Sequence, residues 1–169
     1  MIYVPVNIKM EVIIRINGFR HNHGCTDVDI SEKLSQIADQ WAKKIAAAGT
    51  EKIDPTSPYG QLVCSHSSGS NIAKACVVKW YGAVQYFDWA EPKLTPKSSP
   101  FTQLVWKKNT EAGVGFAKGG GIKRNNVGGK YYVVVLFNPG QDAKENIKEN
   151  VLPATGKLAN SDESQTFTF

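Results

Sequence analysis

The sequence predicts an α/β protein in which helices cover both faces of a small mixed or antiparallel sheet, an α-β-α sandwich. Two observations predict this class. Segments with helical periodicity occupy the first half of the chain, and segments with strand character occupy the second half. The run Tyr131–Phe137, YYVVVLF, is apolar at every position, which is typical of a central strand buried on both faces. Such a strand requires a covering layer on each side of the sheet, and the predicted helices can supply both layers.

The first half of the chain contains two predicted helices. One runs over Glu11–Asn22 and is expected to end near Gly24, a residue type that favours helix C-termini. The next contains an apolar stripe over residues 34–45, at spacings of three and four, and Ser31 precedes it as a predicted N-cap. Residues 49–69 are rich in Pro, Ser, Thr and Gly, so we expect them to be mostly loop.

A third predicted helix follows at the end of the first half, and predicted strands make up the second half. Residues 72–84 form a broad apolar helical face, and prolines follow it. Residues 101–106 and 113–117 are predicted to be short strands before the central strand. The glycine-rich and basic segment 118–130 is predicted to be a flexible hairpin tip between two strands.

Size and composition fit one soluble globular domain over residues 1–169, with a polar tail at 154–169. The 169 residues are 41% hydrophobic and 21% charged, with a net charge of +5 that favours contact with acidic surfaces. No apolar run reaches the roughly 20 residues of a membrane-spanning helix. The N-terminal residues lack the basic start and apolar run of a secretory signal.

The cysteine content predicts a reducing compartment. Cys25, Cys64 and Cys76 form an odd and sparse set, so we expect no disulfide framework. Together with the N-terminal sequence, this favours an intracellular location. Export without a leader remains open.

A series of short motifs occurs in a fixed order along the chain. They are INGFR at 16–20 with HG at 23–24, WA at 41–42, WY at 80–81, PFTQLVW at 100–106, GVG at 113–115 and NVLP at 150–153. The series resembles the CAP superfamily, the cysteine-rich secretory, antigen 5 and pathogenesis-related proteins, over about residues 11–153. The likeness is greatest to its Golgi-associated plant pathogenesis-related and non-secreted venom allergen-like branch. The resemblance implies the CAP fold, and a cytoplasmic location or a peripheral one on Golgi-type membranes.

The resemblance also implies a cleft that has lost its chemistry. In the family two His and two Glu surround one central cleft, and the corresponding positions are Ile53 or its neighbour Asp54, Gln61, Ala83 and Pro100. Two imidazoles and two carboxylates could bind a divalent metal or transfer protons. An amide, a methyl group and a pyrrolidine ring cannot. We therefore expect no enzymatic activity and neither a metal nor another cofactor in this cleft.

Two other segments contain residue types that occur in catalytic or metal sites. His21 and His23 are two residues apart, and such residues point to different faces of a helix, which disfavours zinc binding. Cys64 and His66 place a thiol near an imidazole, but no orienting group accompanies them, which disfavours a nucleophilic pair. The glycines at 119–121 lack the strand-to-helix context of a phosphate-binding loop.

The proline-rich segment 86–101 carries the candidate lipid-binding residues. These are Tyr86, Phe87, Trp89, Leu94 and Phe101. In secreted family members the corresponding region resembles an aromatic loop proposed to bind sterols. One interpretation is that these side chains close the end of the core. The other is that they shape an apolar site for a sterol or fatty acid beside a cleft without charge.

The predicted hairpin tip carries four positive charges and no acid, at Lys118, Lys123, Arg124 and Lys130. These side chains either are simply solvated or contact anionic lipid headgroups. The segment has no aromatic side chain for base stacking, so we expect no nucleic-acid partner. The sequence thus favours a non-catalytic protein that binds lipid or associates peripherally with membranes. The alternative is a protein interaction module or homodimer without a ligand.

Overall fold

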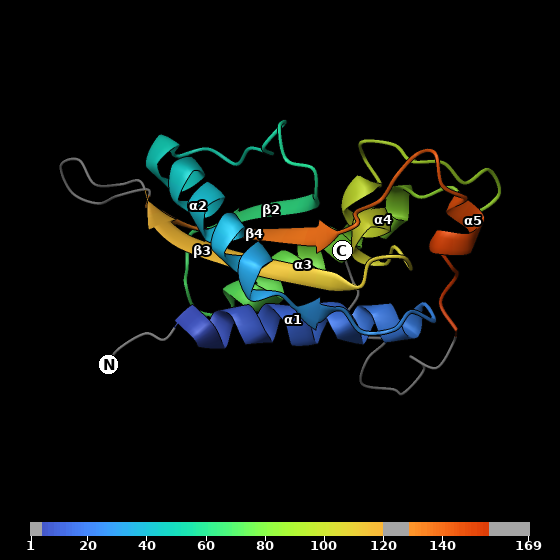
Figure 1. Cartoon of the computed structure of the whole chain (residues 1–169), viewed down its shortest axis with the longest axis horizontal. Coiled ribbons are helices and arrows are strands. Elements are labelled where there is room, and N and C mark those ends of the chain that lie inside the picture. Colours follow the sequence, from blue (N-terminus) through green and yellow to red (C-terminus); the bar gives the residue numbers. More distant parts are fainter. Residues whose placement is uncertain (1–4, 120–128, 156–169) are drawn as a thin grey trace.

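The computed structural model describes residues 5–119 and 129–155, and strands are interspersed among its helices along the chain (Figure 1). In order they are α1 (Pro5–Asn22), β1 (Asp29–Ile30), α2 (Glu32–Ala48), β2 (Gly60–His66), α3 (Ile72–Gly82), the 3-10 turn η1 (Ala83–Tyr86), α4 (Ser99–Leu104), β3 (Glu111–Gly119), β4 (Lys130–Asn138) and α5 (Ile147–Asn150).

The four strands form one mixed sheet in the order β1-β3-β4-β2. β1 is parallel to β3, whereas β4 is antiparallel to both of its neighbours, with Val135 opposite Leu62 on one side and Val114 on the other. Residues 132–137 of β4 are all buried. The prediction of a central strand covered on both faces is therefore confirmed.

The sheet lies between two helical layers (Figure 1). Tyr132, Val134 and Leu136 of β4 point to α2, where they pack with apolar side chains of that helix. Val133, Val135 and Phe137 point to the opposite face and share a core with α1, α3 and α4. The alternation of side chains along a strand thus assigns successive residues of β4 to two different cores. This arrangement is the predicted α-β-α sandwich.

Helix α2 begins and ends where the sequence predicted. The Ser31 hydroxyl accepts a hydrogen bond from Leu34 N at 3.1 Å, and Gly49 closes the helix with φ 73°. α2 then approaches β3 very closely. A Cβ at Gly115 would lie 2.2 Å from the backbone carbon of Ala38, so only glycine fits at this position. The Ser35 hydroxyl adds a hydrogen bond from Val114 N at 3.1 Å.

The secondary-structure predictions missed one strand and assigned one helix wrongly. Residues 49–69 are mostly loop, as predicted, but residues 60–66 within them form the unpredicted β2, which pairs along its whole length with β4. Residues 101–106 are not a strand, because the chain forms α4 over Ser99–Leu104. Proline is favourable in the first helical turn, and Thr102 N donates to Ser98 O at 3.1 Å. Burial of this turn between other elements overrides the strand propensity of its aromatic and β-branched residues.

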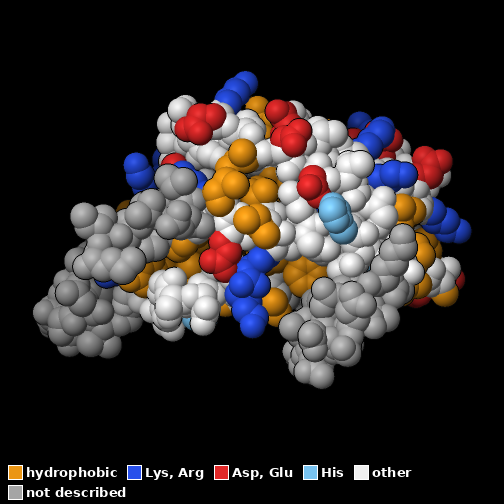
Figure 2. All heavy atoms as spheres, turned by 90° about the horizontal axis from the view of Figure 1, so that it is seen from below, with side chains coloured by type: hydrophobic (Ala, Val, Ile, Leu, Met, Phe, Trp, Pro, Cys, Tyr) orange, Lys and Arg blue, Asp and Glu red, His pale blue; other side chains and the backbone are white. Residues whose placement is uncertain are grey.

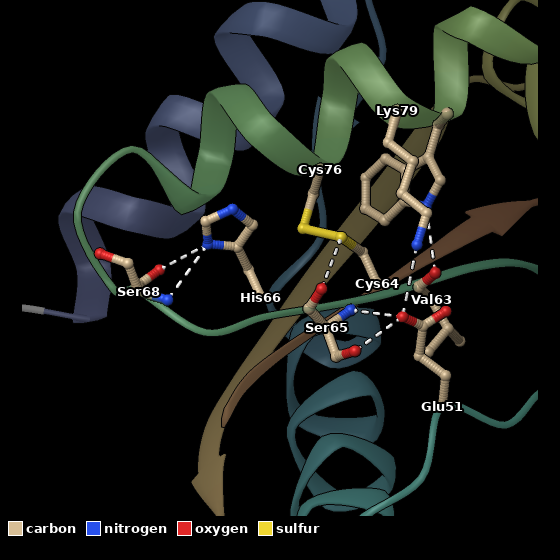
Figure 3. The surroundings of a disulfide bond; sticks show 9 residues. Glu51, Val63, Cys64, Ser65, His66, Ser68, Cys76 and Lys79 are labelled. Atoms are coloured by element: carbon tan, nitrogen blue, oxygen red, sulfur yellow. Dashed lines mark hydrogen bonds and ion pairs between the residues drawn. A yellow bond between two sulfur atoms is a disulfide. The ribbon is translucent and has the colours of Figure 1, made fainter. Parts of the chain in front are cut away.

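Against the expectation of no disulfide framework, two of the three cysteines are paired. A disulfide joins Cys64 on β2 to Cys76 on α3, with Cα atoms 5.7 Å apart, and Cys25 is a buried free thiol (Figure 3). The pairing depends on β2 lying under α3, and β2 was not predicted. The cysteines therefore give no support for a reducing compartment.

Helix α1 begins at Pro5, six residues before the predicted start, and its outer face is partly apolar. Ile8, Val12 and Ile16 face the core. Met10 and Ile14, four residues apart on the opposite face, have exposed fractions of 43% and 64%. Figure 2 shows this side of the molecule, where hydrophobic side chains form a central group among charged ones. None of the helices in the described ranges is both long and apolar enough to span a membrane.

Candidate functional site

The candidate lipid-binding residues divide into a buried set and an exposed set. Phe87 and Phe101 are buried in the core, with ring centroids 5.7 Å apart, and Leu94 packs against the same core. Trp89 and Tyr86 have exposed fractions of 44% and 52%. The Trp89 ring meets Phe87 edge to face at 4.6 Å, so one aromatic cluster extends from the core to the surface. Only its outer members can contact a ligand without a rearrangement of the core.

His23 lies at the centre of this cluster, buried beneath Trp89. Its Nδ1 is 2.7 Å from the Leu152 carbonyl oxygen, and its Nε2 is 2.8 Å from the Tyr81 hydroxyl. A carbonyl oxygen only accepts, so Nδ1 carries the proton and the Tyr81 hydroxyl donates to Nε2. Burial lowers the pKa of His23 despite the hydrogen bond to Leu152, and it raises the pKa of Tyr81 to about 12. His23 is therefore a neutral structural residue.

Arg20 anchors the chain around α4 to helix α1. Its guanidinium is fully buried and donates to the carbonyl oxygens of Leu104 at 3.0 Å, Trp106 at 2.9 Å and Asn109 at 2.9 Å. Nε adds a hydrogen bond to Thr26 O at 3.0 Å. Burial lowers the pKa of Arg20 from its ordinary value. Arg20 was noted only as part of the INGFR motif. An arginine among the apolar residues of a predicted helix was itself a signal of a buried polar anchor.

The four positions aligned with the family's cleft residues have structural roles or none. The Gln61 amide accepts from Asp54 N at 2.9 Å and donates to Asp54 O at 2.6 Å, which fixes the loop before β2. Ile53 is half-exposed, Ala83 is buried in η1, and Pro100 lies in the first turn of α4. With Ile53 at the first position, the four side chains contain no imidazole or carboxylate, whereas its neighbour Asp54 carries a carboxylate. Within the described residues, no group of three or more His, Cys, Asp or Glu side chains could hold a metal ion.

The remaining predicted sites are only partly described. Lys118 Nζ lies 5.5 Å from the ring centroid of Tyr131, and Lys130 is opposite Gly119 where β3 and β4 pair. Lys123 and Arg124 lie outside the described residues, as do the glycines at 120 and 121.

The two histidine-containing segments form no catalytic or metal site among the described residues. His21 is exposed beside Asp27, on a different side of α1 from the buried His23. Cys64 is in the disulfide and has no free thiol. His66 Nδ1 accepts from Ser68 N at 3.2 Å and does not serve Cys64 (Figure 3).

Comparison with known proteins identifies the relatives of this fold. A family model described as the cysteine-rich secretory protein family, CAP, matches residues 13–137. The chain is 28% identical over 146 residues to Golgi-associated plant pathogenesis-related protein 1 of Homo sapiens. This match covers 85% of this chain and 91% of the human protein. The chain is 27% identical over 110 residues to Repressed by EFG1 protein 1 of Candida albicans, covering 64% of this chain but 39% of the fungal protein.

A solved structure supports the same fold. The venom allergen-like protein 4 of Schistosoma mansoni superposes with a TM-score of 0.64 and 15% identity, over 88% of this chain and 95% of that one. At this level of identity the likeness concerns the fold alone. The combination of fold and family match accounts for the order of motifs along the chain.

Proposed function

Because this chain belongs to the CAP family of cysteine-rich secretory proteins, we propose that it is a non-catalytic member of that family. In this proposal it binds a lipid, which is either a sterol or a fatty acid, and associates peripherally with membranes. The observation that carries the proposal is the exposed Trp89 on top of a buried aromatic cluster. A large aromatic side chain that is 44% exposed and packs on a buried aromatic cluster offers apolar surface to a guest or a membrane interface.

The non-catalytic part of the proposal rests on the side chains at the cleft positions. Gln61 uses both ends of its amide to hold Asp54, and an amide does not ionise, so this side chain cannot act as a general acid or base. Ala83 and Pro100 have no polar side-chain atom that transfers a proton or binds a metal. Hydrolysis would require a proton acceptor at one of these positions.

The membrane part of the proposal rests on charge and on one relative. A net charge of +5 favours adsorption to anionic lipid surfaces. Lys118 and Lys130 lie on the paired ends of β3 and β4, which places two positive charges at this end of the sheet. The human relative is Golgi-associated by name, so a Golgi-type membrane is the location we propose.

Equilibrium binding of labelled cholesterol and labelled palmitate to the purified protein tests this function. We expect saturable binding that is the same with calcium, zinc or a chelator. Trp89→Ala should weaken sterol binding about tenfold, because it removes one aromatic contact of the size that dominates apolar interfaces. Ile30→Ala is the control, since it shortens another exposed apolar side chain, 45% exposed, outside both the aromatic cluster and the cleft positions. Absence of saturable binding of either lipid at micromolar protein would exclude the function.

The alternative is a homodimer that forms through the outer face of α1. Met10 and Ile14 expose apolar surface on one face of this helix, and a second copy of the chain could bury it. Sedimentation equilibrium of the wild type and of Ile14→Lys tests this alternative. A dimer that the substitution dissociates would favour it, and a monomeric wild type would exclude it.

A further inference from the structure

The last described residues of the chain are attached beside the aromatic cluster that contains Trp89. Thr155 N donates to Asn22 O at 2.7 Å, and the carbonyl oxygen of Leu152 accepts from His23 Nδ1 at 2.7 Å. The His23 ring in turn lies parallel to the Trp89 ring, with centroids 6.5 Å apart and an interplanar angle of 4°. Figure 1 shows α5, which precedes this attachment, at the same end of the molecule as the last turn of α1.

This attachment makes the path from Thr155 to the Trp89 ring short. Thr155 contacts the residue before His23, and the His23 ring faces Trp89. With standard backbone dimensions, these contacts place Thr155 N within about 16 Å of the centre of the Trp89 ring. Residues 153–155 are exposed. The chain that follows Thr155 therefore starts at the surface, close to the exposed Trp89.

Residues 156–169 follow Thr155 and lie outside the part of the chain that the structure describes. Their sequence is GKLANSDESQTFTF, which is mainly polar and has aromatic residues only at Phe167 and Phe169. The two phenylalanines alternate with threonines. Alternate residues of an extended chain point to the same side. Both rings can therefore contact one apolar surface together.

The spacing between Thr155 and Phe167 suits the distance to Trp89. A fully extended chain of this length spans up to about 40 Å, whereas a random coil of the same length has a root-mean-square end-to-end distance of about 20 Å. The second value is close to the path of about 16 Å, and the effective concentration of a tethered group is highest when the two lengths match. Because that concentration reaches about the millimolar range, weak contacts of two aromatic rings are enough to occupy the surface.

The surroundings of Trp89 favour an apolar occupant over a charged one. Trp89 is 44% exposed and packs edge to face on Phe87, with centroids 4.6 Å apart. The exposed charged residues between positions 88 and 97 are balanced in sign, namely Asp88, Glu91, Lys93 and Lys97. A charged group therefore gains little there, whereas further aromatic rings add edge or face contacts of the kind already present. Phe167 and Phe169 would supply such contacts.

We propose that residues 156–169 dock on the aromatic cluster of the same molecule, with Phe167 and Phe169 against the exposed face of Trp89, and compete there with an apolar guest. The docking itself does not require the proposed lipid-binding function, whereas the competition rests on it. A guest must displace two tethered rings. Its apparent affinity is therefore reduced to the fraction of molecules in which the surface is free.

NMR spectroscopy of the whole, nitrogen-labelled chain tests the docking without any lipid. The indole N–H signal of Trp89 is identified by its absence from the spectrum of Trp89→Phe. Phe167→Ser/Phe169→Ser should shift this signal, because two aromatic rings beside the indole are lost. Thr166→Ser/Thr168→Ser is the matched control, since it changes the intervening positions but keeps both rings, and it should leave the signal in place. Urea denaturation verifies that each variant folds.

Two further measurements test the contact from its other side and its effect on a guest. Trp89→Ala should shift the backbone amide signals of Phe167 and Phe169, and Ile30→Ala, which shortens an exposed side chain elsewhere, should not. In the assay with labelled cholesterol and palmitate, Phe167→Ser/Phe169→Ser should bind about three- to tenfold more tightly than the wild type. That gain corresponds to a surface that is free in about a tenth to a third of wild-type molecules.

The remaining outcomes separate this proposal from the proposed function. An unchanged Trp89 signal in Phe167→Ser/Phe169→Ser, or an equal shift in the threonine variant, would overturn the docking even if lipid binds. A wild-type signal that moves on dilution would overturn docking within one molecule and assign the rings to a second copy of the chain. Unchanged lipid affinity in a variant whose Trp89 signal has shifted would overturn the competition. A shift that depends on the two rings, without saturable lipid binding, would support the docking and exclude the proposed function.

Discussion

His23 and Tyr81 are joined by a hydrogen bond of 2.8 Å although 58 residues separate them in the chain. The bond connects the end of α1 to the last turn of α3, and the other ring nitrogen of His23 reaches Leu152 near the end of the described chain. Three distant segments therefore meet at one neutral imidazole. Protonation of that imidazole would remove the acceptor for the Tyr81 hydroxyl.

The first prediction concerns the effect of pH on the free energy of unfolding. Burial lowers the pKa of His23 in the folded state, whereas the unfolded chain binds this proton near pH 6.5. Below pH 6.5 the unfolded state therefore binds more protons than the folded state. The contribution of neutral His23 to the free energy of unfolding is complete above pH 6.5 and declines as the pH falls toward the folded-state pKa. Urea denaturation between pH 7.5 and 5 measures this decline, which is at most about 1.4 kcal/mol per pH unit for one group.

Two glutamine variants separate His23 from the other histidines. His23→Gln should reduce stability at pH 7.5 and flatten the pH dependence in this window. His21→Gln, at an exposed position, should leave the stability at pH 7.5 close to that of the wild type. An unchanged slope in His23→Gln would contradict the assignment.

The second prediction concerns Arg20. Arg20→Lys keeps the charge but loses the planar arrangement of donors that reaches four carbonyl oxygens, so it should lower the free energy of unfolding by about 3 kcal/mol or more. Arg15→Lys is the matched control, because Arg15 is half-exposed and, among the described residues, forms an ion pair only with Glu11, an interaction typically worth less than about 0.5 kcal/mol. Similar urea midpoints for the two variants would show that the buried guanidinium is not an anchor.

The third prediction concerns the disulfide. The sequence separation of 12 between Cys64 and Cys76 corresponds to about 3 kcal/mol of stabilisation in the chain-entropy estimate. Reduction of the wild type should lower stability by about this amount, and reductant should have no effect on a variant with serine at both positions. Thiol titration of the denatured, unreduced protein should give one thiol, from Cys25. Three thiols would contradict the pairing.

Elements with a strong local signal could be predicted, and elements that depend on tertiary contacts could not. The Ser31 cap and the apolar stripe after it identified α2, and the run of apolar residues in β4 identified the central strand. β2 contains Gly60, Ser65 and His66, which resemble loop residues, and its strand form depends on pairing with β4. The disulfide could not be predicted without β2.

The candidate site was predicted in composition but not in arrangement. Phe87, Trp89 and Phe101 do lie together, with centroids 4.6 to 6.1 Å apart. Which of these side chains are buried and which are exposed could not be predicted. The chain between η1 and α4 has no regular period that separates an inner from an outer face. His23 was missed as a member of the cluster, since its partners Tyr81 and Leu152 are remote in sequence.

The same substitution at two glycines should have opposite effects, which tests the packing of α2 on the sheet. At Gly115 the added Cβ would lie 2.2 Å from the backbone of Ala38, which cannot move without displacing α2, so Gly115→Ala should cost at least about 2 kcal/mol of unfolding free energy. At Gly18, in the interior of α1, no atom lies within 4 Å, so Gly18→Ala should add about 0.5 to 1 kcal/mol by reducing the freedom of the unfolded chain. Urea denaturation measures both values. If Gly115→Ala yields too little folded protein, the double variant Gly115→Ala/Gly18→Ala replaces it. The melting temperature of this double variant is then compared with that of Gly18→Ala, and the difference gives the effect of Gly115→Ala. A stability equal to that of the wild type in Gly115→Ala would mean that α2 is not held in direct contact with β3.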